Sequence, residues 1–295
     1  VFGMPIALWS DWHVPKTVLL SETGGINEYN LDVFQRRARS LVEKCIMLPN
    51  EYLPHPKFDG IVLLLGGDMH NGLLRPSDAA RSFMDVYPGV FEVVRAIKAG
   101  ITAFKKHYTK VHVKAVVGNH GRHTDKWQHG GQVKATLDWV IYKIVEECFS
   151  GDPHVSFDIS DSPELMFTVY EKTYLFCHGH LDRGGEGITG KFYPVMRGFA
   201  KRSERQMLIG SPIDTEIVCH WHGYAHLMRM IVNGSLIGLD PYAFEKAMTP
   251  EDPVQALWVD TPDMGTSFPF PVFPDGVKLT GGKSKALKGG FHGKQ

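Results

Sequence analysis

Short apolar runs, each ending in a polar cluster, alternate with longer amphipathic segments in the first half of the chain. The apolar runs are typical of buried strands, and they lie at residues 5–10, 60–67 and 110–118. In the longer segments apolar residues recur every three or four positions, which predicts helices near residues 31–47, 89–107 and 133–149. Strands and helices that alternate in this way form sheets covered by helices.

The second half of the chain has a different pattern. After residue 153 the apolar runs are short and closely spaced, as in "LMFTVYE" and "TYLFCHG". This spacing predicts a second, more antiparallel set of strands. We therefore expect an α/β fold in which two mixed sheets pack face to face between helices, a four-layer αββα sandwich.

The chain is predicted to contain one large domain at residues 1–248, because α/β folds of about 250 residues often form a single unit. Pro and Gly accumulate after this point, so residues 249–295 are predicted to form a C-terminal extension. The Gly- and Lys-rich end of the extension has little to bury and is predicted to be disordered.

Charge and cysteine content limit the class of protein. Basic and acidic residues are equal in number, at 32 each, so no overall charge favours nucleic acid or a membrane surface. No run approaches the roughly 18 apolar residues of a membrane span. The four cysteines are widely spaced in segments predicted to be buried, which is typical of a reduced, intracellular chain. We expect a soluble protein that is not secreted and has no membrane partner.

Polar clusters that could bind metal recur where the predicted strands end. Ligands in open α/β sheets bind outside the carboxyl ends of the strands, so distant segments can converge there. The mixture of carboxylate, amide and imidazole suits a pair of Mn, Fe or Zn ions. It is richer in nitrogen than Ca or Mg sites and has too little thiolate for structural zinc. The clusters are "SDWH", "GGDMH", "GNH", "CHGH" and "CHWH".

In order and spacing these clusters resemble the motifs of calcineurin-like metallophosphoesterases, D-x-H, GD, GNH, H and GHxH, over about residues 5–240. The resemblance implies two divalent metal ions, expected to be Mn²⁺, with Fe, Zn or Mg as alternatives. By motif position, the implied ligands are Asp11, His13 and His222 for one metal, Asn119, His178 and His220 for the other, and Asp68 as the bridge.

His120 is the implied catalytic residue. It would lie beside the metals without binding them, and it would stabilise the phosphate or protonate the leaving oxygen. The family commonly has Asp or Glu next, which orients this imidazole, whereas this chain has Gly121 and then Arg122. Asp125 is one candidate for the orienting group, and the other interpretation is that nothing orients His120. A second departure is Cys219, which replaces the first Gly of GHxH and should crowd that turn.

Two ligand assignments have competitors. His180 competes with His178 for one ligand position. In "CHWHGYAH" the pair could be His222 and His226, although the one-residue gap between His220 and His222 fits the motif.

Other side chains near the motifs are predicted to contact substrate: Arg122, His70 and Arg183. His70 could instead be a solvated loop residue. The basic link at residues 181–206 could bind phosphates beyond the scissile one or form a solvated helix face. Trp12 or Trp127 could stack on a base, although burial is the default role of a tryptophan.

Hydrolysis of phosphate esters at a dinuclear metal site is the expected function. The basic link and the aromatic residues favour a phosphodiesterase or nuclease acting on DNA or nucleotides. The strings "GNHGR" and "VNGSLIG" resemble phage-encoded members of the family and, distantly, the repair exonucleases. We expect the protein to be cytoplasmic. If a phage encodes it, the cytoplasm is that of the host cell.

Two other functions are alternatives. A phosphomonoesterase or small-nucleotide (cyclic nucleotide) phosphodiesterase is favoured by the balanced charge. A non-catalytic scaffold with the same fold is disfavoured, because such scaffolds usually lose ligands, and this chain has all seven presumed ligands and His120.

Overall fold

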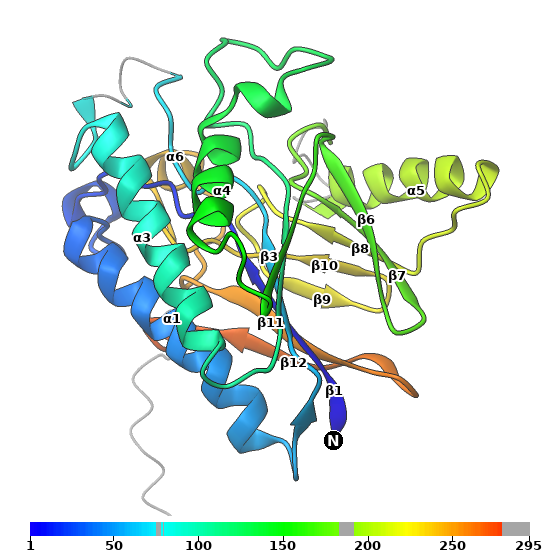
Figure 1. The fold of residues 1–295 in the computed structure, drawn as a ribbon. Helices are drawn as coiled ribbons and strands as arrows, with labels where there is room; N and C mark the ends of the chain where they lie inside the picture. Colours follow the sequence, from blue (N-terminus) through cyan, green and yellow to red (C-terminus); the bar gives the residue numbers. More distant parts are fainter. Residues whose placement is uncertain (75–77, 79, 183–191, 279–295) are drawn as a thin grey trace, which may run out of the picture.

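The structure is a computed structural model that describes residues 1–74, 78, 80–182 and 192–278. Its first sheet, within these residues, contains β1 (Phe2–Trp9), β2 (Lys57–Phe58), β3 (Ile61–Leu65), β4 (Val111–Ala115), β5 (Val155–Ile159), β11 (Gln255–Thr261) and β12 (Gly265–Val272). The strand order is β12-β11-β1-β3-β4-β5, and β2 pairs with β1. Strands β1, β3, β4 and β5 are parallel, whereas β11 and β12 are antiparallel to their neighbours (Figure 1).

The second sheet is also mixed. It contains β6 (Glu164–Val169), β7 (Lys172–Cys177), β8 (Thr215–Val218), β9 (Ala225–Leu227) and β10 (Met230–Val232), in the order β6-β7-β8-β10-β9. Strands β7, β8 and β10 are parallel, and the edge strands β6 and β9 run antiparallel to them. The more antiparallel character expected for the second half is therefore confined to the edges of this sheet.

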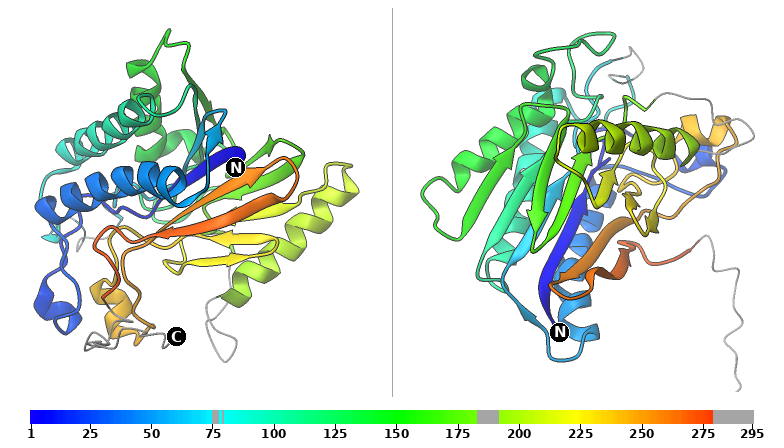
Figure 2. Two further views of the ribbon diagram at one scale, coloured as in Figure 1. Left: turned by 90° about the horizontal axis from the view of Figure 1, so that it is seen from below. Right: turned by 90° about the vertical axis from the view of Figure 1, so that its right-hand side faces the viewer.

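Helices cover the outer faces of both sheets (Figures 1 and 2). The first sheet is covered by α1 (Leu31–Tyr52), α3 (Val86–Phe104) and α4 (Leu137–Cys148), and the second by α5 (Phe192–Leu208). Short helical segments are η1 (Leu20–Thr23), η2 (Val133–Ala135) and α6 (Pro241–Glu245). The order helix, sheet, sheet, helix is the four-layer arrangement expected from the sequence, so the predicted fold class is confirmed.

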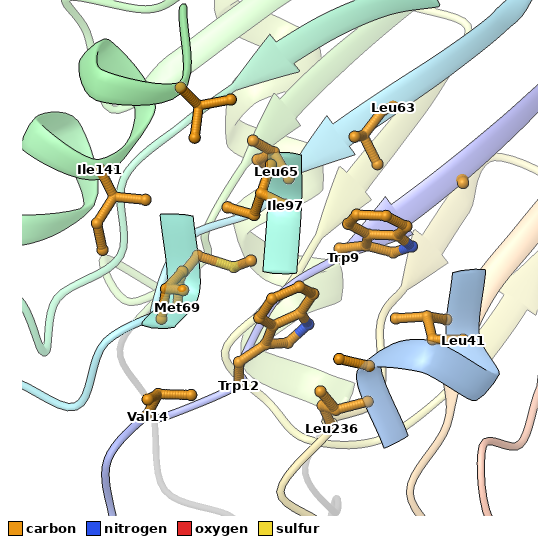
Figure 3. Close-up of a cluster of buried hydrophobic side chains, with 14 of the residues drawn as sticks. Trp9, Trp12, Val14, Leu41, Leu63, Leu65, Met69, Ile97, Ile141 and Leu236 are labelled. Atoms are coloured by element: carbon orange, nitrogen blue, oxygen red, sulfur yellow. The ribbon is translucent and has the colours of Figure 1, made fainter. Parts of the chain in front are cut away.

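Alternate residues of the central strands point to opposite layers of core. In β1, Ile6 and Leu8 pack between the sheets, whereas Ala7 and Trp9 pack under the helices. In β7 of the second sheet, Leu175 packs beneath α5. Strands buried on both faces read as continuous apolar runs, which explains why they were visible in the sequence. Figure 3 shows the core under the helices, where the strand residues Trp9, Leu63 and Leu65 gather with the helix residues Leu41, Ile97 and Ile141.

The helix boundaries follow local capping. Asn30 precedes α1, and its side chain accepts a hydrogen bond from the Val33 N–H. Thr136 does the same for α4 by accepting from the Trp139 N–H. The predicted helix near 133–149 is therefore two elements, because the chain is extended at Thr136 between η2 and α4.

Part of the predicted C-terminal extension lies in the first sheet. Strand β11 pairs with β1, and Trp258 is completely buried between the two sheets. Strand β12 contains Pro269 and Pro271, which a sheet tolerates because β12 is an edge strand. These prolines gave the segment the composition of a loop. The predicted disordered tail, at residues 281–295, lies outside the described residues.

None of the helices among the described residues has both the length and the apolar character that a membrane span requires.

Candidate metal centre

The loops that follow β1, β3, β4, β7 and β8 carry the predicted ligands. The three strands of the first sheet are parallel to one another, as are the two of the second, so within each sheet the loops leave the same edge. The two edges meet at the site, since Asp68 Oδ2 lies 3.0 Å from His178 Nε2. Residues that are 110 positions apart in sequence therefore become neighbours at the junction of the sheets.

Three overlapping groups of donor atoms occupy this junction. In each group the potential ligand atoms lie within 4.8 Å of one another. His13 is shared by the first and second groups and Asp68 by the second and third, so Asp68, the predicted bridge, lies between the donors of the two predicted metals. The groups are Asp11, His13 and His222; His13, Asp68 and His120; and Asp68, His178 and His220. The structure thus brings together six of the seven predicted ligands and His120, while their metal-binding roles remain predictions.

Asn119, the seventh predicted ligand, also fits a cation. Its side-chain oxygen Oδ1 is buried and has no hydrogen-bond partner among the described residues. A buried carbonyl oxygen without a partner costs about 1–3 kcal/mol, so such groups normally meet a donor, a water or an ion. Carboxylate oxygen, amide oxygen and imidazole nitrogen together form a donor set that suits a divalent transition metal.

Hydrogen bonds fix which imidazole nitrogens face the centre. His178 Nδ1 lies 2.6 Å from the Gly66 carbonyl oxygen, and His13 Nδ1 lies 3.2 Å from Asn71 Oδ1. A carbonyl oxygen only accepts, so each Nδ1 carries the hydrogen and each Nε2 keeps its lone pair for a metal. This geometry favours His178 over His180, which belongs to none of the donor groups found among the described residues. His226 lies in β9 and is likewise absent from these groups.

Burial and close contacts between carboxylates and imidazoles shift the pKa values of the residues in the centre. Burial alone would raise the pKa of Asp68, but neighbouring histidines, above all His178, hold it well below its ordinary value. Burial would lower the pKa of His178, yet Asp68 outweighs this effect and raises it to about 9. Burial lowers the pKa of His13 well below its ordinary value and that of His220 to about 3. Metal binds ionised carboxylates and neutral imidazoles, so His13 and His220 are already in the form that binds, whereas His178 must release a proton when metal enters.

Several predicted ligands have an unusual backbone conformation. Residues with side chains rarely adopt a positive φ, and each instance costs on the order of 1 kcal/mol. Such strain persists where surrounding contacts impose it, and it concentrates at functional sites. The chain imposes it here through backbone hydrogen bonds from Asp11 N to Gly67 O (3.0 Å) and from His13 N to Asp68 O (2.9 Å). The ligands concerned are Asp11 (54°), His13 (51°), Asp68 (51°), His220 (72°) and His222 (48°).

The residues between the ligands anchor the loops in the core. Trp12 separates Asp11 from His13 and is 1% exposed, and Met69 follows Asp68 and is completely buried. Figure 3 shows both side chains, with Val14, in the core beneath the helices. Because Trp12 is buried, it is not available to stack on a base.

Helix α4 supports two of the loops through side chains that the sequence analysis did not identify. Asp138 Oδ2 accepts from the N–H groups of Asp68 (2.8 Å) and Gly118 (2.9 Å), and its Oδ1 accepts from Met69 N–H (3.1 Å). The Tyr142 hydroxyl, one turn later, accepts from Gly67 N–H at 3.1 Å. The sequence offers one sign of this role, which is that Asp138 is an acid on the apolar face of a predicted helix.

Asn71 is a second supporting residue that was missed. Its side chain accepts from the predicted ligand His13, and its backbone carbonyl oxygen lies 3.3 Å from His120 Nδ1. The carbonyl therefore orients the His120 ring in this chain. Among the described residues no hydrogen bond links Asp125 to His120, so the orienting contact suggested for Asp125 is not found. His120 N–H also donates to Asp68 Oδ1 at 2.7 Å.

Cys219 is accommodated by a glycine on the neighbouring loop. The side chain is completely buried, and a Cβ placed on Gly66 would lie 2.3 Å from Cys219 Sγ. The crowding expected from Cys219 is thus relieved because residue 66 has no side chain.

The predicted substrate contacts have varied surroundings. Arg122 donates to the carbonyl oxygens of Asn119 (2.5 Å), Thr124 (2.8 Å) and Asp125 (2.7 Å), so it braces its own loop. A pocket of about 320 Å³ borders this loop at Arg122, and none of the predicted ligands is among its lining residues. Arg183 lies outside the described residues.

His70 matches neither interpretation proposed for it. Its side chain is completely buried rather than solvated. Nε2 donates to the Val86 carbonyl oxygen at 3.1 Å, and Nδ1 accepts from Gly72 N–H at 2.9 Å. With both nitrogens bonded to the backbone, the ring fixes the start of α3 against the Asp68 loop, and no donor is left for substrate.

The basic link is partly neutralised within the chain. Arg202 of α5 is buried and forms a bidentate pair with Asp182 (2.7 and 2.8 Å) and an ion pair with Glu216. Arg205 pairs with Glu164. These two cations join α5 to the second sheet, and their charges are offset by acids of the same chain.

The chain matches no protein-family model and no curated protein. Among solved structures it is similar to Vps29 from Cryptosporidium parvum, at 12% identity over 88% of this chain and 86% of that one, with a TM-score of 0.36. It is also similar to wild-type Vps29 in complex with Zn²⁺ from Entamoeba histolytica, at 12% identity over 92% and 100% of the chains and a TM-score of 0.32.

A further similar structure is a predicted phosphoesterase from Streptococcus pneumoniae TIGR4, at 12% identity over 90% and 97% of the chains and a TM-score of 0.29. Likeness at this level assigns no family and no activity. The function of the chain is therefore argued from the donor atoms gathered at the junction of its two sheets.

Proposed function

We propose that this protein is a metal-dependent hydrolase of phosphate esters. The observation that carries the proposal is the series of three donor groups, linked to one another through His13 and Asp68, where loops from both sheets meet. The first sheet would contribute Asp11, His13, Asp68 and Asn119, and the second would contribute His178, His220 and His222. A shared carboxylate between two groups of donors suits two cations about 3.5–4 Å apart.

A pair of divalent cations would supply Lewis acidity toward the phosphoryl oxygens and favour ionisation of the attacking water. The chain would position the ester beside the cations and manage one proton. With Nδ1–H of His120 directed to the Asn71 carbonyl, Nε2 is the nitrogen left for substrate. Only the protonated ring carries a hydrogen on Nε2 as well, and in that form Nε2–H would stabilise the phosphate or pass its proton to the leaving oxygen. Burial lowers the pKa of His120, which makes the protonated ring a stronger acid.

Within phosphate esters, we infer that the substrate is a phosphodiester, with DNA as the expected polymer. Trp127, a partly buried aromatic side chain beside His180, supports a substrate that carries a base or another flat group. A phosphomonoester or a small cyclic nucleotide is the second candidate. It is favoured by the internal pairing of Arg202 and Arg205, which leaves the basic link with fewer cations for a polymer.

Metal reconstitution followed by substrate comparison tests both levels of the proposal. The protein would be stripped with a chelator, reconstituted with Mn²⁺, Fe²⁺, Zn²⁺ or Mg²⁺, and analysed for bound metal. We expect about two ions per chain and Mn²⁺-dependent hydrolysis of bis(4-nitrophenyl) phosphate and of linear DNA. Failure to bind metal would overturn the proposal.

The other results separate the remaining candidates. Intact DNA together with cleavage of 4-nitrophenyl phosphate or a cyclic nucleotide would identify the second candidate. Bound metal without turnover of any ester would instead support a non-catalytic scaffold.

A further inference from the structure

His180 lies beside the predicted ligands without joining them. Its ring centroid is 5.5 Å from that of His178 and 6.4 Å from that of His220. The intervening Gly179 has a φ of 101°, and a Cβ there would lie only 2.6 Å from Val218 Cγ1. The glycine therefore permits the tight turn that holds two imidazoles at the same centre, one inside the donor groups and one next to them.

Both ring nitrogens of His180 are buried, and neither has a hydrogen-bond partner in the part of the chain that the structure describes. A neutral imidazole carries one N–H donor and one acceptor nitrogen. Burying such groups unmet costs free energy, and folded proteins rarely leave them so without a functional reason. The ring is thus suited to receive polar groups that belong to a ligand.

Trp127 holds this ring in place from the other sheet. The centroids of the two rings are 4.2 Å apart, with the planes at 55°. Trp127 follows β4 and packs against the core under the helices, whereas His180 follows β7. The pair therefore places an indole and an imidazole beside the predicted ligands His178 and His220.

We propose that His180 and Trp127 form the subsite for the second alcohol group of a phosphodiester. This inference rests on the proposed function and deepens it. A phosphomonoester has one alcohol group and a doubly charged phosphoryl group, which cations and charged donors bind best. A phosphodiester carries one charge and a second, uncharged alcohol group. An imidazole N–H can donate to the oxygen of that group, and the indole can contact its apolar part.

The test compares a diester with a monoester in matched variants. His180→Phe keeps a ring against Trp127 but removes both nitrogens, and His180→Gln restores a donor. With Mn²⁺, we expect His180→Phe to lower the ratio of kcat/KM for bis(4-nitrophenyl) phosphate to that for 4-nitrophenyl phosphate by about tenfold. His180→Gln should recover part of the ratio, and bound metal should equal the wild-type amount in both variants.

His226→Phe is the matched control. His226 also lies beside a tryptophan, with its ring centroid 6.3 Å from that of Trp258, and its Nδ1 is buried without a partner among the described residues. Because it is outside the donor groups, its replacement should leave the substrate ratio unchanged.

Each other outcome has a distinct meaning. An unchanged ratio of the two kcat/KM values in His180→Phe, whether both are unaffected or both fall equally, would overturn the subsite. Loss of metal in this variant would make His180 a ligand instead. If the wild-type protein hydrolyses neither ester, the proposed function fails and the subsite fails with it, whereas wild-type turnover with an unaffected variant overturns the subsite alone.

Discussion

Asp68 links the two halves of the candidate centre. Its carboxylate reaches His178 through Oδ2 and the His120 N–H through Oδ1, and it is shared by two donor groups. Asp68→Ala should therefore abolish metal binding and hydrolysis together, because it removes the only donor common to both predicted metal positions. Metal analysis and diester turnover would be measured on the same preparation.

The control for Asp68 is an acid of the same kind outside the site. Asp158 of β5 is exposed and pairs with Lys114 at 3.1 Å, so Asp158→Ala should keep metal and activity. A circular dichroism spectrum like that of the wild type would show that Asp68→Ala is folded. Retention of both metals in that folded variant would contradict the bridging role.

His120 differs from the ligands because its replacement should separate binding from catalysis. The Asn71 carbonyl and the Asp68 carboxylate hold residue 120 through its ring and its backbone. His120→Ala removes the ring alone, so both metals should remain while kcat falls by about 10²–10⁴-fold. Equal activity in wild type and variant would show that no proton transfer depends on this imidazole.

The motif residues could be found in the sequence, whereas their supporting residues could not. Asp11, Asp68 and His178 each follow an apolar run, and this placement survives folding because strand ends are local features. Asp138 accepts backbone N–H groups of other loops, and Asn71 contacts the rings of His13 and His120; those contacts exist only once the strands are ordered in the sheet. No spacing in the sequence encodes them.

At the scale of elements, α4 acts as a brace for the loops after β3 and β4. Asp138 and Tyr142 lie one turn apart and accept N–H groups from both loops. Asp138→Asn keeps the shape of the side chain but turns one acceptor into a donor that faces backbone donors. We expect metal affinity to fall about 10–100-fold, since ligands lose their orientation, while the helix itself persists.

Isothermal titration with Mn²⁺ would measure the effect of Asp138→Asn, and Tyr142→Phe offers a milder comparison. The phenol accepts one N–H and donates to the Val116 carbonyl at 3.3 Å, so its loss should change affinity less. Equal affinities in wild type and Asp138→Asn would show that the loops hold their conformation without α4.

The accuracy of the element predictions follows from burial. Strands β1, β3 and β4 were visible because layers of core on both faces demand continuous apolar sequence. Strand β12 lies at the edge of the sheet, where alternating exposed and partly buried positions accept Pro269 and Pro271. Its sequence therefore resembles a loop, and only its pairing with β11 reveals a strand.

At the scale of the whole molecule, the candidate centre joins the two sheets. Asp11, His13, Asp68 and Asn119 follow strands of one sheet, and His178, His220 and His222 follow strands of the other. Metal bound across this junction should stabilise the folded chain, because the unfolded chain has no such set of donors. At about 100 times Kd the gain would be about 2.7 kcal/mol, or roughly 5 °C in Tm for a chain of this size.

The stabilisation of the folded chain by metal should increase as pH rises. In the metal-free protein Asp68 raises the pKa of His178 to about 9, from an ordinary value of 6.5. The folded state then holds a proton that the unfolded state releases. The contribution of the Asp68–His178 pair to the stability of the metal-free protein is therefore complete below pH 6.5 and is lost as pH rises toward 9. Metal competes with the same proton and binds better as pH rises. The Tm difference between metal-loaded and chelated protein, followed by scanning fluorimetry, should therefore widen from pH 6.5 to 9, and a constant or narrowing gap would mean that His178 does not bind the metal.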